Sequence, residues 1–302
     1  NPPCPCIHSD PQFGDCALEP PETIRGWLAT VRELTGTASG LRTGPLSYAE
    51  TGMYAFGDRA AGDWMVFKAA PLEPAHQPGH AHCDLGSYEL SAGGRRIIVD
   101  SGVGTYEQSL WRNYYRSTRA HNVATVDGRE QMEYWGSFRV GRRFPDVRVV
   151  SVQLGGHVAR IGIEHEAFAP VTMRREVVWL QDKRVWMVAD RIRGPGEFLA
   201  ETHLHFHPDC SVDLEGEGWV VSRDGGAVLW VFPHGSTRSG LVHGHEAPLQ
   251  GWYAPHYGDA MPGWVLTLRA PIQGDAALGY ALCREPNAAY HSDLRLLMTG
   301  KP

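Results

Sequence analysis

From about residue 47 onwards, short apolar runs alternate with turn residues along the chain. The runs are rich in Val, Ile, Trp and Phe, which is typical of β-strands. The segments between them favour turns, namely Gly93-Gly94, Asp127-Gly128, Gly155-Gly156, Gly194-Pro195-Gly196 and Asp224-Gly225-Gly226. The predicted strands are Trp64–Phe67, Ser87–Leu90, Arg96–Val99, Val123–Val126, Val147–Val152, His157–Ile163, Glu176–Leu180, Val185–Ala189, His203–Phe206, Trp219–Ser222, Ala227–Phe232 and Trp264–Arg269. About a dozen strands without intervening helices predict a mostly β fold, a large antiparallel β-sandwich.

One helix is predicted, from Pro21 to Leu34. Its apolar residues fall on one face at helical spacing, namely Ile24, Trp27, Leu28, Val31 and Leu34. The Gly, Ser and Thr residues from Gly36 to Gly44 end it. We therefore divide the chain into an irregular and helical segment, residues 1–45, and a β-sheet domain, residues 46–302.

The net charge argues against nucleic-acid binding, and the hydropathy argues against a membrane-spanning helix. The formal net charge is −6 at pH 7, whereas a general nucleic-acid-binding domain is normally basic. No apolar run approaches the roughly 20 residues that a membrane-spanning helix needs, so no span is expected. The region from Trp111 to Arg143 departs from this balance, with seven Arg against three acidic residues. This excess suits an acidic polymer with carboxylate or sulfate groups, although the chain uses Arg as its main cation throughout.

The candidate chemistry centres on four residues. His80 and His82 lie two apart, so in an extended strand their imidazoles point the same way. Asp100 follows an apolar strand 18 residues after His82, and His121 precedes another strand 21 residues later. Two imidazoles and one carboxylate at strand ends make a plausible three-ligand zinc set. Spacing alone is weak evidence, because 15 histidines give many chance pairings.

Two further histidine-containing segments have two readings each. His203, His205 and His207 alternate along one predicted strand, where they form either a metal site or an ordinary packed or exposed strand. Glu164-His165-Glu166 is either an acid/base cluster or a solvated strand edge.

Three ordered motifs and a late one resemble the signature of a known family. They are Gly79-His80-Ala81-His82-x-Asp84-x-x-Ser87-Tyr88-Glu89-Leu90, Val99-Asp100-x-Gly102, Tyr114-x-Arg116-Ser117-Thr118-x-Ala120-His121-Asn122-x-x-x-Val126-Asp127-Gly128 and Trp252-Tyr253-x-Pro255-x-Tyr257-Gly258. They are similar to those of the heparinase II/III-like polysaccharide lyases, and the resemblance covers most of residues 50–270.

The resemblance implies a two-part enzyme, an N-terminal α/α toroid and an antiparallel β-sandwich, which cleaves acidic polysaccharides by β-elimination in a cleft between the two parts. It implies that His80 lines this cleft and assists proton transfer or holds the substrate carboxylate. It further implies that His82, Asp100 and His121 hold a structural zinc near the cleft. Elimination needs an acid, a base and stabilisation of enolate charge, which suits these residue types.

Tyr115 and Arg116 are candidate substrate-binding residues, and a structural role at the edge of the core is an equal alternative. A guanidinium binds carboxylates, and a tyrosine stacks on or hydrogen-bonds to sugars.

The sequence departs from the family pattern because the toroid, which supplies further catalytic residues, is missing from these 302 residues apart from a remnant in residues 1–45. We therefore expect little or no lyase activity from this chain alone, and activity from a full-length parent. A non-catalytic domain that binds acidic glycan, or a purely structural one, is the alternative. The substrate class implies a periplasmic or secreted location.

Overall fold

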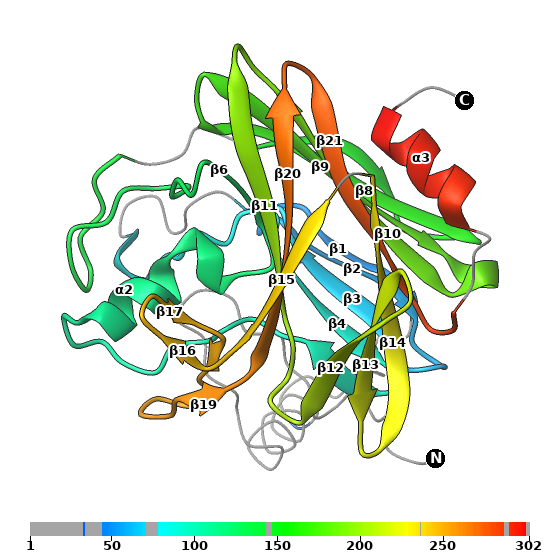
Figure 1. The fold of residues 1–302 in the computed structure, drawn as a ribbon, viewed down its shortest axis with the longest axis horizontal. Coiled ribbons are helices and arrows are strands. Elements are labelled where there is room, and N and C mark those ends of the chain that lie inside the picture. Colours follow the sequence, from blue (N-terminus) through cyan, green and yellow to red (C-terminus); the bar gives the residue numbers. More distant parts are fainter. Residues whose placement is uncertain are drawn as a thin grey trace.

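The computed structural model describes Glu33 and residues 44–70, 78–142, 147–235, 237–286 and 290–299. In these residues the fold is built mainly from strands (Figure 1). The strands are β1 Leu46–Tyr48, β2 Met53–Asp58, β3 Asp63–Lys68, β4 Tyr88–Ala92, β5 Arg95–Ile98, β6 Ala124–Val126, β7 Arg148–Gln153, β8 Val158–Phe168, β9 Val171–Leu180, β10 Val185–Arg193, β11 Glu197–His205, β12 Cys210–Glu215, β13 Gly218–Arg223, β14 Gly226–His234, β15 Arg238–His243, β16 His245–Glu246, β17 Leu249–Gln250, β18 Trp252–Tyr253, β19 Met261–Pro262, β20 Trp264–Gln273 and β21 Ala276–Cys283. The helices are α2 Leu110–Arg116 and α3 His291–Thr299, with short 3-10 turns η2 Pro78–His80, η3 Thr118–Ala120 and η4 Gln181–Lys183.

These strands form three larger sheets. The first has the order β1-β2-β3-β4-β5, the second β12-β13-β14-β21-β10-β9-β8-β7, and the third β15-β20-β11-β6. The pairs β16-β17 and β18-β19 are separate. The paired strands run antiparallel, which confirms the predicted fold class.

One hydrophobic core is shared by the three sheets. Phe56 and Phe67 come from the five-stranded sheet, Ile163 and Trp186 from the eight-stranded sheet, and Leu266 from the four-stranded sheet. All five side chains are fully buried. Burial of each large apolar side chain stabilises the fold by about 1.5–3 kcal/mol, so the packing of sheet on sheet is the main source of stability.

Each predicted strand overlaps a strand of the structure, but the helix prediction was incomplete. Two helices that the sequence pattern did not predict, α2 and α3, are present. Helix α2 has only seven residues and buries Arg112 and Arg116, so it shows no apolar stripe. Helix α3 packs Leu294 and Leu297 on the outer face of the eight-stranded sheet.

The predicted helix from residue 21 to 34 lies outside the described residues, except that Glu33 is helical and exposed. The proposed division at residue 45 therefore stays a prediction, although the first described strand does begin at Leu46. None of the described helices is long and apolar enough to span a membrane.

Candidate functional site

The predicted metal ligands meet where the five-stranded and four-stranded sheets come together. His82, Asp100 and His121 are buried, with at most 1% of each residue exposed. The Nδ1 atom of His121 lies 2.7 Å from Oδ2 of Asp100, and the His82 and His121 ring centroids are 5.3 Å apart. Residues separated by up to 39 positions in the sequence are thus brought into one cluster.

Asn122 explains how His121 is held in place. Its side-chain amide donates to the backbone oxygens of Tyr88 on β4 (2.8 Å) and of Val99 directly after β5 (2.9 Å). Its Oδ1 accepts the backbone N–H of His205 on β11, at 2.8 Å. One buried amide therefore ties β4, β5 and β11 together directly beside His121.

Neighbouring charges act against burial at two residues of this region, His121 and Asp84. Burial disfavours the imidazolium of His121, but the carboxylate of Asp100 outweighs burial and raises the pKa of His121. Burial likewise opposes ionisation of Asp84, but the Lys68 ammonium at 2.7 Å outweighs it and lowers the pKa of Asp84. Neighbouring charges thus outweigh burial at both groups.

The donor types of this cluster fit zinc, which binds imidazole and carboxylate groups. The Nε2 atom of His121 is buried and, among the described residues, has no hydrogen-bond partner. The placement of the side chains is that of a hydrogen-bonded cluster, however, because Asp100 is bonded to His121 and a guanidinium nitrogen of Arg112 lies 3.3 Å from Nε2 of His82. Within the part of the chain that the structure describes, no group of three or more His, Cys, Asp or Glu side chains is placed to hold a metal ion.

His80 lies beside this cluster but faces solvent. It ends the turn η2 and is exposed. Its ring makes edge contacts with Tyr106 (centroids 5.8 Å apart) and Phe138 (5.4 Å), and the ring of Tyr257 lies 5.4 Å from that of Tyr106. We call His80, Tyr106, Phe138 and Tyr257 the His80 cluster.

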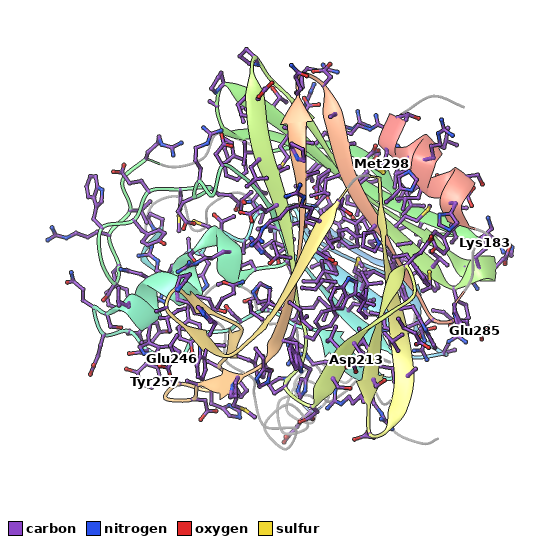
Figure 2. All side chains as sticks on the ribbon, viewed as in Figure 1. Lys183, Asp213, Glu246, Tyr257, Glu285 and Met298 are labelled. Carbon is purple, nitrogen blue, oxygen red and sulfur yellow. The ribbon has the colours of Figure 1, made fainter. Side chains whose placement is uncertain are left out.

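Arg112 contacts two aromatic rings of the His80 cluster. Its guanidinium lies 5.1 Å from the Tyr106 ring centroid and 5.7 Å from that of Phe138, and its Nε donates to the backbone oxygen of Ser137. Cation–π contacts of this kind stabilise the rings above a buried charge. Figure 2 shows Tyr257 and Glu246 at the edge of the molecule, on the side where α2 lies.

The two predicted substrate-binding residues are both buried. Arg116 donates to the backbone oxygens of Ala81 (3.2 Å) and Gly136 (2.7 Å), and its guanidinium lies 5.2 Å from the Tyr134 ring centroid. Tyr115 places its hydroxyl 3.5 Å from the backbone oxygen of Asp259, and burial raises its pKa. These contacts are those of structural residues. A substrate contact for either residue stays a prediction, and burial does not favour it.

His203 and His205 on β11 are buried, and His207 follows directly after this strand. His203 hydrogen-bonds to the Thr267 hydroxyl (3.1 Å), and burial lowers its pKa to about 4. Burial also lowers the pKa of His205 well below its usual value, and lowers that of the half-buried His207 to about 4. All three are neutral near pH 7, which agrees with the packed-strand reading.

Sequence reasoning missed Tyr106 and Phe138, and it counted Arg112 only as one of the seven arginines between Trp111 and Arg143. No periodic pattern marks them, and only the fold brings residues 106, 112 and 138 next to His80. Tyr257 belongs to the late motif that begins at Trp252, but the motif did not indicate a function for it.

Comparison with known proteins identifies the family of this chain. Residues 42–271 match the family described as heparinase II/III-like, C-terminal. The chain belongs to this family. The resemblance carried by the histidine motifs is therefore confirmed.

Individual members of the heparinase II/III-like group are distant relatives. The heparin-sulfate lyase of Pedobacter heparinus is 24% identical over 174 residues, which is 55% of this chain and 24% of that protein. The crystal structure of heparan sulfate lyase HepC from Pedobacter heparinus superposes with a TM-score of 0.76 at 18% identity, over 94% of this chain and 45% of that one. A crystal structure of heparinase III gives a TM-score of 0.73 at 15% identity, over 91% and 44%. The chain thus spans less than half the length of these relatives, and the structural likeness shows the fold.

Proposed function

We propose that this chain is the β-sheet part of a polysaccharide lyase that cleaves a uronate-containing acidic glycan by β-elimination. Family membership supports the reaction class, because the related proteins are lyases of heparin and heparan sulfate. The observation that carries the proposal is the exposed imidazole of His80, held between two aromatic rings beside a buried, ion-paired cluster. Such glycans occur outside the cytoplasm, so we also propose a periplasmic or secreted location.

The reaction defines what His80 would do. A base removes the proton on the uronate carbon next to the carboxylate, and the resulting electron pair forms a carbon–carbon double bond. The bond to the leaving sugar breaks, and the departing oxygen takes a proton. A neutral imidazole accepts or donates a proton near pH 7, or hydrogen-bonds to the carboxylate that carries the developing charge. The rings of the His80 cluster offer apolar faces against which a sugar can stack.

A lyase assay tests the proposal. We expect the longest natural polypeptide that contains this chain to release an unsaturated uronate from heparin, heparan sulfate or alginate, measured by its ultraviolet absorbance. His80→Ala should lower kcat about 100-fold or more, the usual contribution of a general acid or base. His157→Ala is the matched control, since His157 is an exposed histidine paired with Asp182 at a remote turn. The 302-residue chain alone should release no product.

An unchanged kcat in the His80→Ala variant would contradict the assignment. Salt-sensitive retention of the full polypeptide on heparin, without any product, would instead favour a non-catalytic glycan-binding protein.

We also propose that zinc binds at His82, Asp100 and His121, where it would pin the strand ends together. The converging imidazole and carboxylate donors and the unpartnered Nε2 of His121 support it. Native mass spectrometry and metal analysis should find about one zinc per chain. His82→Ala should lose the metal and lower the melting temperature, because structural zinc contributes directly to folding. His80→Ala should keep both. A chain that is folded but contains no metal would contradict the zinc proposal, and these residues would then form only a hydrogen-bonded cluster.

A further inference from the structure

Three arginines gather around one carboxylate on the outer face of the eight-stranded sheet. Arg160 on β8 and Arg174 on β9 both donate to the same oxygen of Glu176, Arg160 through Nε at 2.9 Å and Arg174 through a terminal nitrogen at 3.0 Å. Arg191 on β10 approaches the other carboxylate oxygen at 3.7 Å and donates to the backbone oxygen of Leu297 at 3.1 Å. We call Arg160, Arg174 and Arg191 the arginine triad.

The charge of this group is not balanced. Three guanidinium groups face one carboxylate, which leaves a local excess of two positive charges. Arg174 and Arg191 are also direct cross-strand partners, an arrangement in which like charges destabilise a sheet. Burial lowers the pKa of Arg191, Glu176 opposes this, and Arg174 and Arg160 lower it further. An added anion would relieve this repulsion.

Other arginines on the same face are neutralised one to one. Arg148 pairs with Glu164, which is the cross-strand partner of Arg174, and Arg193 pairs with Asp275 at 3.1 Å. The excess of positive charge is therefore a property of the triad and does not extend over the whole face.

The triad remains accessible to a ligand. The side chains of Arg160, Arg174 and Arg191 are 40%, 32% and 29% exposed, whereas Glu176 is 1% exposed. The planar guanidinium group donates paired hydrogen bonds, which match the oxygens of a sulfate or a carboxylate. Each of the three side chains is therefore exposed enough to contact a ligand, although the carboxylate between them is buried.

We propose that the arginine triad is a second glycan-binding site, which takes a sulfate group of an acidic polysaccharide. The choice of a glycan as the ligand rests on the proposed function, and the choice of an anion rests on the charges alone. The triad lies next to the C-terminal end of α3, and Figure 1 shows α3 on the opposite side of the fold from α2 and the β16–β17 pair. A long polymer held at both places would gain apparent affinity without any new contact at the His80 cluster.

Binding of a heparin oligosaccharide of defined length to the 302-residue chain tests this site. Calorimetry at low ionic strength is suitable, because exposed charges are then least screened. Arg160→Gln combined with Arg174→Gln should weaken binding on the order of tenfold, from the loss of two charge-assisted contacts. Arg148→Gln combined with Arg193→Gln removes the same charge from the same face and should change the dissociation constant less than about twofold. Melting curves verify that each variant is folded.

Equal loss of affinity in the two double variants would mean that only net charge matters, and would overturn the proposal. Unchanged binding by the triad variant would also overturn it. So would a failure of the unmodified chain to bind the oligosaccharide. If the triad variant does not fold, Arg160→Gln alone decides, with an expected weakening of about threefold, since Arg160 is the most exposed of the three. Inorganic sulfate at equal ionic strength should compete with the oligosaccharide more strongly than chloride does. This experiment measures binding and not turnover. A negative result in the lyase assay would therefore not change what the binding experiment shows about the arginine triad.

Discussion

His165 shows at the scale of one residue how a strand separates neighbouring polar groups. It points into the core from β8 and is 4% exposed, while Glu166 is exposed and Glu164 pairs with Arg148. The alternation of a strand therefore rules out both sequence readings for His165, the acid/base cluster and the solvated edge. Burial, with a smaller effect of Arg175, lowers the pKa of His165 to about 3.

This buried histidine should make stability depend on pH. Its pKa is about 3 in the folded protein and near 6.5 when unfolded, so the unfolded chain binds the extra proton. Its contribution is present above pH 6.5 and is lost as the pH falls toward 3, at up to about 1.4 kcal/mol per pH unit. Denaturant titrations at several pH values should show a shallower decline for His165→Gln than for the unmodified protein. Identical slopes would contradict this.

At the scale of an element, the short helix α2 positions Arg112 next to the His80 cluster. A seven-residue helix is unstable in isolation, so its tertiary contacts and its cap maintain it. Arg112 and Arg116 anchor it to the backbone oxygens of residues 136 and 137, and Ser109 caps its first turn by accepting the backbone N–H of Arg112 at 3.2 Å. This anchoring places Arg112 under the His80 cluster.

Loss of the cap should be measurable as a change in stability. Ser109→Ala leaves the N–H of Arg112 without its acceptor and should lower the free energy of unfolding by about 1 kcal/mol. Chemical denaturation measures this. Ser211→Ala, at an exposed position on β12, is the control and should change stability by less than about 0.5 kcal/mol. A Ser109→Ala variant as stable as the control would show that tertiary contacts alone hold α2.

At the scale of the whole molecule, Arg175 joins the three sheets. From β9 it forms a two-point ion pair with Asp190 on β10, at 2.7 and 2.8 Å. It also donates to the backbone oxygens of Gly86 and Asn122, next to the other two sheets. Burial disfavours its charge, but Asp190 outweighs burial and raises its pKa. The junction thus fixes the sheets around the cluster that contains His121.

Removal of one partner should be costly. Asp190→Asn leaves a buried guanidinium without its counter-charge and should lower the free energy of unfolding by about 3–5 kcal/mol. Asp275→Asn breaks the exposed pair with Arg193 and should cost less than about 1 kcal/mol. Thermal and denaturant unfolding of the two variants, side by side, measures the difference. Similar small losses in both would mean that Arg175 finds other partners.

The sequence by itself determined twelve of the described strands, because alternating apolar runs and glycine turns are local signals that each segment carries alone, but it did not predict others such as β2, β12, β15 and β21. It also singled out His80, His82, Asp100 and His121, because their motifs are short and ordered. Only the tertiary structure decided that His80 is exposed among Tyr106, Phe138 and Tyr257, and that three arginines from three strands surround Glu176. Burial and charge pairing depend on which strands become neighbours, and long-range packing sets that choice.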